Sequence, residues 1–192
     1  MKWVSIILLL SACAGQKVFY VSNDAWKEDY DTFVEVSQAI NTHLQCNLIV
    51  VHFSGMVLTP SDYGKGYGFV SFTNNAETLE YLENSSKYLK KNIVGQTLIT
   101  GAINYARYFE TDILLTTVVN DPRYVISSYP YEQRLAYFVD LHELGHALGL
   151  PHSLESADIM AESVPSQWWL GVSDFQWIRF TNALKERGFK CP

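Results

Sequence analysis

Apolar side chains recur along this chain with two different periods, and each period predicts its own kind of element. Helical spacing predicts helices over residues 24–44, 76–91, 130–148 and 174–187, with Ser173 as the N-cap of the last. Each of the last two helices is expected to stop at the glycine that follows it, because glycine readily takes the conformation that ends a helix. In residues 24–44 the apolar positions share one face; they are Trp26, Tyr30, Phe33, Val34, Ile40 and Leu44.

Shorter runs rich in β-branched and aromatic residues predict the strands of a sheet. These runs are residues 18–21, 48–53, 69–73, 97–103 and 112–119. Residues 48–53 are apolar almost throughout, which is typical of a strand in the middle of a parallel sheet. Strands and helices with no internal linker predict a single domain of the α/β or α+β class.

The first residues are predicted to be an export signal. Lys2 is followed by an apolar run over residues 3–10, which is shorter than the roughly 20 residues needed to span a bilayer. The sequence LSAC, ending at Cys13, resembles a bacterial lipobox, in which the signal is cut before a cysteine that then carries lipid. We therefore expect a signal over residues 1–12 and a mature domain over residues 13–192, anchored to a membrane of the bacterial cell envelope by acyl chains.

The alternative is a plain secretory signal cut near Ala14 or Gly15, which would give a soluble secreted protein; the mass of the exported chain distinguishes the two. Either form of export allows disulfides. If Cys13 carries lipid, Cys46 and Cys191 remain as an even pair that would tie the first helix to the C-terminus. Two unpaired thiols are the other possibility.

The net charge of −6 argues against nucleic acid as a partner. Contacts with phosphates need clustered Lys and Arg, and no such cluster is present. The densest basic stretch, Lys87, Lys90 and Lys91, is better explained as the end of a helix.

Three of the five histidines lie in the segment HELGHALGLPH, residues 142–152. His142 and His146 are four residues apart, which places both rings on one helix face about 5–6 Å apart. Both can then reach one ion at about 2.0–2.1 Å. Gly149 allows a sharp turn through positive φ, and that turn can return His152 as a third ligand. Three nitrogen ligands with a fourth position left open are typical of a catalytic zinc site.

Glu143 lies about 100° further round the same helix than His142. This places its carboxylate beside the ion and towards its open side. Glu143 is therefore predicted to be the general base that acts on the water held by the metal.

The segment HELGHALGLPH resembles the zinc-binding consensus HExxHxxGxxH of the metzincin peptidases, and the Ser153 that follows is typical of the matrixin branch. Asp158-Ile159-Met160 resembles the methionine turn of that family, which implies that Met160 forms a floor under the metal and is not a ligand. The resemblance is strong over residues 142–160, weaker over residues 94–187, and absent from residues 1–93.

The resemblance implies a fold, a cofactor and a substrate class. The fold is a zincin-type α+β domain with a twisted, mostly parallel sheet, an active-site helix and a C-terminal helix. The cofactor is one catalytic Zn²⁺ on His142, His146 and His152. Residues 97–103 would be the edge strand that pairs with an extended protein or peptide substrate, with residues 112–116 as its neighbour.

The function predicted is a zinc-dependent endopeptidase. An inactive relative that serves as a surface binding module is the main alternative, and the intact Glu143 argues against it. A zinc-buffering lipoprotein is a third possibility, but the chain has no His-rich tract. His52 is expected to be a core or edge histidine and not a second metal site, and Trp168 and Trp169 either line a cleft or pack in the fold.

Overall fold

The computed structural model describes eight parts of the 192-residue chain. They are residues 16–23, 27–56, 68–72, 96–99, 111–115, 135–163, 167 and 170–189. The expected signal with Cys13, the helix over residues 76–91, Trp168 and Trp169 all lie outside these parts. Cys46 is disulfide-bonded, and because Cys191 also lies outside, its pairing with Cys46 stays a prediction.

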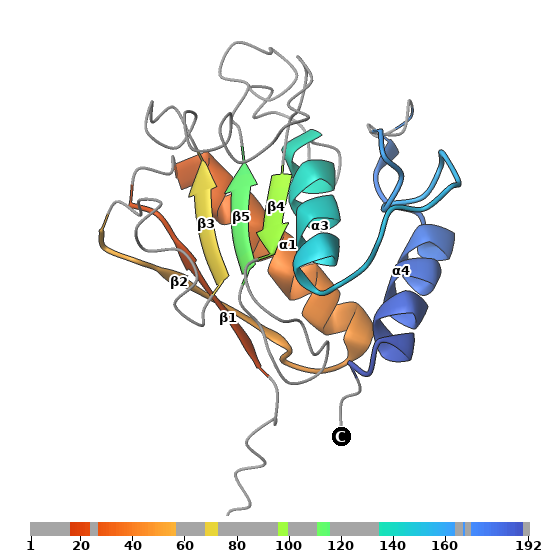
Figure 1. Ribbon diagram of the computed structural model, residues 1–192, viewed down its shortest axis with the longest axis horizontal. Coiled ribbons are helices and arrows are strands. Elements are labelled where there is room, and N and C mark those ends of the chain that lie inside the picture. The colour runs from red at the N-terminus through yellow and green to blue at the C-terminus, as the bar shows by residue number, and fades with distance from the viewer. Residues whose placement is uncertain are drawn as a thin grey trace, which may run out of the picture.

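Five strands form one sheet, which confirms the predicted mostly parallel arrangement. The strands are β1 (Lys17–Val21), β2 (Ile49–Phe53), β3 (Gly68–Phe72), β4 (Gln96–Ile99) and β5 (Thr111–Leu115). Their order is β2-β1-β3-β5-β4 (Figure 1). Neighbouring strands are parallel, except that β4 runs antiparallel to β5. The sheet therefore ends in an antiparallel strand.

The prediction that residues 48–53 form a central strand was wrong. β2 lies at one end of the strand order, and its burial falls from Ile49 to Phe53, whose side chain is 47% exposed. Helix α1 contacts the strand, whose first residue, Ile49, is buried. Tyr30 packs edge-on against Phe53, and Tyr20 stacks on the exposed His52. His52 is thus an edge histidine, as expected.

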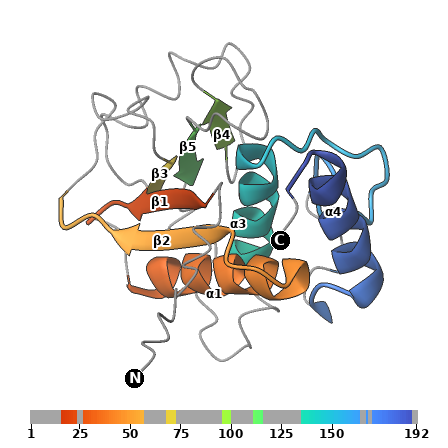
Figure 2. The same ribbon diagram turned by 90° about the horizontal axis from the view of Figure 1, so that it is seen from below.

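Three helices are described: α1 (Lys27–Leu44), α3 (Leu135–Ala147) and α4 (Asp174–Glu186). Helix α1 crosses one face of the sheet and contacts both α3 and α4, while α3 lies beside β4 (Figures 1 and 2). The core lies where these elements meet and includes Phe19, Phe33, Ile40, Val70, Leu141, Leu144, Phe180 and Leu184. No helix in the described parts is both long and apolar enough to cross a membrane.

All three helices end in the same way, with a residue of positive φ just past the last turn. These residues are Gln45 (59°), Gly149 (85°) and Gly188 (94°). In each case the next residue donates its N–H to the carbonyl five positions earlier, which is the Schellman pattern. The stops predicted at Gly149 and Gly188 are therefore confirmed, and so is the N-cap at Ser173, which forms a capping box with Gln176.

Candidate metal centre

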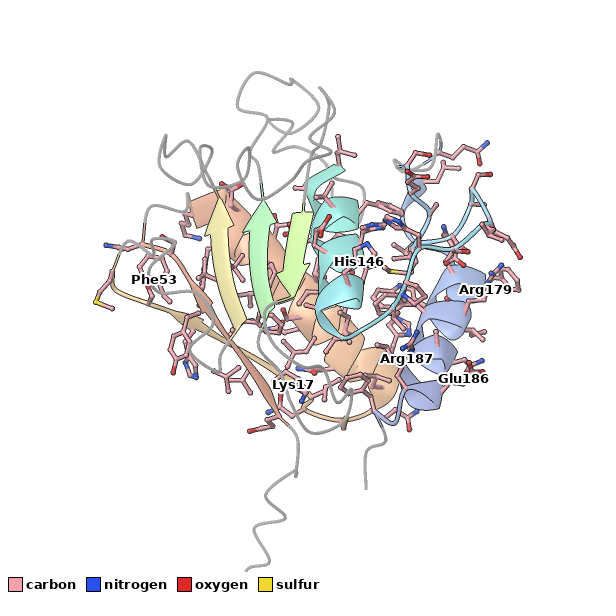
Figure 3. The ribbon with its side chains drawn as sticks, in the orientation of Figure 1. Lys17, Phe53, His146, Arg179, Glu186 and Arg187 are labelled. Carbon is pink, nitrogen blue, oxygen red and sulfur yellow. The ribbon has the colours of Figure 1, made fainter. Side chains whose placement is uncertain are left out.

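Helix α3 carries the first two histidines and is buried on nearly every side. Ten of its 13 residues are buried, because the helix packs between α1 and the strands β4 and β5. His142 and His146, on one face, are half-buried, as is Ala136 in the first turn. His146 projects from α3 towards the segment that leads to α4 (Figure 3). A rigid, buried helix therefore presents two imidazoles to the same point.

The turn at Gly149 brings the third histidine to that point. The Gly149 N–H donates to the His146 carbonyl at 2.8 Å, and the Leu150 N–H donates to the Gly145 carbonyl at 2.9 Å. The chain then reverses, and the ring of His152 lies 4.6 Å from that of His146, measured between ring centroids. One ring nitrogen from each of the three histidines lies within 4.8 Å of the others. The structure thus brings together all three predicted ligands.

Two backbone carbonyls fix the orientation and the tautomer of the helix histidines. His142 Nδ1 lies 2.9 Å from the Ile159 carbonyl oxygen, and His146 Nδ1 lies 2.8 Å from the Leu150 carbonyl oxygen. A carbonyl oxygen only accepts hydrogen bonds, so each Nδ1 carries the proton. In the neutral ring Nε2 is then left with its lone pair, as a metal ligand requires.

The surroundings keep these two rings neutral. Burial, together with the neighbouring His146 and His152, lowers the pKa of His142 to about 4, although the hydrogen bond to the Ile159 carbonyl partly opposes this shift. Burial also lowers the pKa of His146, with the Leu150 carbonyl acting in the opposite direction. Because a metal binds only the neutral imidazole, both rings are in the ligating state at neutral pH.

The distance between the two Nε2 atoms can be compared with the spacing of zinc ligands. They lie 3.0 Å apart, and neither carries a proton that could join them. Two lone pairs facing each other at this distance repel, and a cation between them removes the repulsion. Nitrogen ligands at about 2.0–2.1 Å from a tetrahedral zinc ion lie roughly 3.3 Å apart, so these residues fit zinc.

Met160, the residue expected to form a floor under the metal, packs against helix α3 at Gly145. Its side chain is 5% exposed. A Cβ atom on Gly145 would lie 2.9 Å from the Phe180 ring and closer still to the Met160 sulfur. The turn therefore reaches α3 only because residue 145 has no side chain. Gly145 was missed in the sequence, although a glycine inside a helix often signals such a close approach.

Two acids of α3 lie near the site, and only one was predicted. Glu143 is buried, with 5% of its surface exposed. Asp140 is also buried, and burial raises its pKa well above the ordinary value; the charges of Asp29 and Glu143 raise it further. Its Oδ2 has no hydrogen-bond partner in the described parts of the chain. The Asp140 carboxyl group therefore keeps its proton more readily than an ordinary aspartic acid does.

Comparisons with known proteins extend this picture beyond the motif. A family model described as Matrixin matches residues 24–178, so the match includes N-terminal residues in which the motif analysis found no resemblance. The fold is similar to the crystal structure of archaemetzincin from Methanopyrus kandleri, with a TM-score of 0.54 and 14% identity over 93% of this chain and 98% of that chain. This similarity confirms the predicted metzincin-type α+β fold. No curated protein matches the chain significantly.

Proposed function

We propose that this chain, which belongs to the matrixin family of peptidases, is a zinc-dependent endopeptidase that hydrolyses peptide bonds in proteins. One observation carries the proposal. His142 and His146 turn unprotonated Nε2 atoms towards each other at 3.0 Å, and His152 joins them to complete a three-nitrogen set. Such a set leaves room in the coordination sphere for a reacting molecule, which a closed structural site does not.

In the proposed mechanism the three histidines hold one zinc ion. Bound there, zinc supplies Lewis acidity, which polarises the scissile carbonyl and makes water acidic enough to lose a proton near neutral pH. The carbonyls of Ile159 and Leu150 keep the rings of His142 and His146 in the ligating tautomer throughout the reaction. These two histidines therefore do not serve as proton donors.

Glu143 is the proposed general base. It directly follows the proposed ligand His142 on α3 and is buried, with 5% of its surface exposed. Glu143 would accept the proton of the attacking water and deliver it to the leaving amine. General acid–base catalysis of this kind contributes about 10²–10⁴-fold to the rate.

Strand β4 is the proposed docking site for the substrate. It lies at the end of the strand order and beside α3, the helix that carries His142 and His146 (Figure 1). An edge strand can add an extended peptide through backbone hydrogen bonds, largely independent of the peptide's sequence. A protein or peptide bound along β4 would therefore run past the histidines.

The test is cleavage of casein and of a mixed peptide library, before and after a chelator removes the metal. We expect cleavage that stops on chelation and returns when zinc is added back. His146→Ala should lose both zinc and cleavage, because two histidines hold the ion far more weakly than three. Cleavage that survives chelation, or full zinc occupancy in His146→Ala, would contradict the proposal. Full zinc occupancy without cleavage of any substrate would point to an inactive binding module.

A further inference from the structure

Residues 153–161 connect the third histidine to the methionine turn and form a loop that is closed at its base. The Ser153 N–H donates to the Met160 carbonyl at 2.7 Å, and Ser153 pairs with Ala161 in an isolated β-bridge. His152 lies immediately before this base. The position of His152 therefore depends on where the loop is held.

The same loop also sets the orientation of His142, because Ile159 supplies the carbonyl that accepts the hydrogen bond from His142 Nδ1. The last residues of the loop, 158–161, are buried, but its tip has few contacts of its own. Residues 154–157 are exposed, and within the loop's tip the Asp158 N–H donates to the Glu155 carbonyl at 3.0 Å. An exposed tip with few buried contacts opens easily unless another element holds it.

Helix α4 provides that external contact through Arg179 (Figure 3). One guanidinium nitrogen donates to the Glu155 carboxylate, and Nη2 of the same group lies 2.9 Å from Asp158 Oδ2. The planar guanidinium joins both carboxylates in one fixed geometry, which lysine cannot reproduce. The Asp158 side chain is only 9% exposed, so this ion pair is less screened by water than an ordinary surface pair.

A second contact from α4 reinforces the first. Gln176 Nε2 donates to the Ala157 carbonyl, and Gln176 Oε1 accepts from the Ser173 N–H at 2.9 Å in the capping box. Gln176 and Arg179 are three residues apart and so share one helix face. The loop is therefore fastened to the first two turns of α4.

We infer that Arg179 is a positioning residue for the metal centre, an inference that rests on the proposed zinc site. Asp158 directly precedes Ile159, so the ion pair with Arg179 restrains the peptide whose carbonyl orients His142. Outer groups that orient metal ligands typically change metal affinity by 10–100-fold. Because Arg179 acts one contact further out, we expect an effect near the lower end of that range.

The experiment measures zinc affinity in Arg179→Met, by competition with a chromophoric chelator. The dissociation constant for zinc should rise about tenfold, and the ion should be released faster to excess chelator. Lys185→Gln is the matched control, because Lys185 is an exposed residue of the same helix and its change removes the same charge. The control should stay within about twofold of the wild type.

Two further variants separate positioning from a loss of folding. Arg179→Lys keeps the charge but not the planar guanidinium. Its dissociation constant for zinc should lie between those of the wild type and Arg179→Met. Asp158→Asn removes the partner and should weaken zinc binding in the same way, while the double variant with Arg179→Met should lose little more than either single change. Denaturant midpoints of the metal-free proteins show whether each variant is folded.

Equal zinc affinity in Arg179→Met and Lys185→Gln would overturn the inference. Losses of zinc affinity that add up in the double variant of Arg179→Met and Asp158→Asn would also overturn it. The same holds if zinc affinity falls only in variants whose denaturant midpoint falls too. A wild-type protein that binds no zinc would overturn the metal centre itself. Peptide cleavage is not measured in this experiment, so a zinc-binding protein without peptidase activity would still test the role of Arg179.

Discussion

The histidines of the proposed metal centre illustrate which contacts can be inferred from a sequence. Their spacing predicted that His142 and His146 share a helix face, since that follows from helix geometry alone. The Leu150 carbonyl that orients His146 is four residues away and could have been inferred from the turn at Gly149. The Ile159 carbonyl that orients His142 is 17 residues away. That contact depends on a loop held by α4, which no local pattern encodes.

Gly145 offers a test of the packing beneath the site. In Gly145→Ala the new methyl group would press on the Met160 sulfur and the Phe180 ring. Overpacking of this kind costs about 1–3 kcal/mol, while alanine gains about 1 kcal/mol over glycine inside a helix. We therefore expect a net loss of about 1 kcal/mol in the free energy of unfolding, measured by denaturant titration of the metal-free protein.

A double-mutant cycle identifies the cause of that loss. If the Met160 sulfur is what resists the methyl group, Gly145→Ala should cost less in a Met160→Ala background, where the space is empty. The coupling between contacting residues is typically about 0.5–3 kcal/mol. Additive effects, or a Gly145→Ala protein more stable than wild type, would show that the turn does not press on α3.

Among the elements, helix ends were easier to predict than the position of strands. The capping box at Ser173 and the glycine stops are local signals, because each motif satisfies backbone groups within a few residues. The place of β2 in the sheet was not predictable in this way. A run of apolar residues looks the same whether other strands flank it or a helix and aromatic rings cover it. The strand order is set by contacts between distant segments.

The contact between α1 and α4 makes stability depend on pH through His43. Its ring stacks on Trp177 with 4.2 Å between centroids. Burial lowers the pKa of His43 below its ordinary value, although the charge of Asp174 partly opposes this. The unfolded chain therefore binds a proton more readily than the folded protein. The stability that neutral His43 contributes is fully present above about pH 6.5, the ordinary pKa of histidine. It is lost as the pH falls through the lower pKa that His43 has in the folded protein.

His43→Phe removes this titration while keeping an aromatic ring against Trp177. Between about pH 7.5 and pH 5.5 the wild type should lose more unfolding free energy than His43→Phe, since only the wild type takes up this proton on unfolding. Urea titrations of both metal-free proteins at each pH provide the comparison. The histidines of the proposed zinc site are the same in both proteins, so their contribution cancels. Equal losses of unfolding free energy in the two proteins would contradict this role of His43.

For the whole molecule, the motif resemblance covered less of the chain than the family does. The recognised motifs lay within residues 94–187, whereas the family model matches residues 24–178. The N-terminal elements β1, α1 and β2 supply core residues such as Phe19, Phe33 and Ile40. Many different apolar residues can fill a core, so such segments carry no short motif. Metal-ligand positions tolerate few residue types, so the motif around the histidines could be recognised in the sequence.

The central claim is that this fold holds a hydrolytic zinc centre whose base is Glu143, and Glu143→Gln tests it most directly. Glutamine preserves the shape of the side chain but removes its basicity, and no ligand is changed. General-base contributions of about 10²–10⁴-fold correspond to about 3–5.5 kcal/mol of barrier. Turnover of a peptide substrate should therefore fall at least about a hundredfold.

Zinc content and melting temperature are measured on the same samples, because the loss is informative only if both are unchanged. The account predicts a folded, zinc-loaded Glu143→Gln protein that cleaves the peptide at about 1% of the wild-type rate or less. Equal cleavage by Glu143→Gln and the wild type, with zinc bound in both, would contradict it.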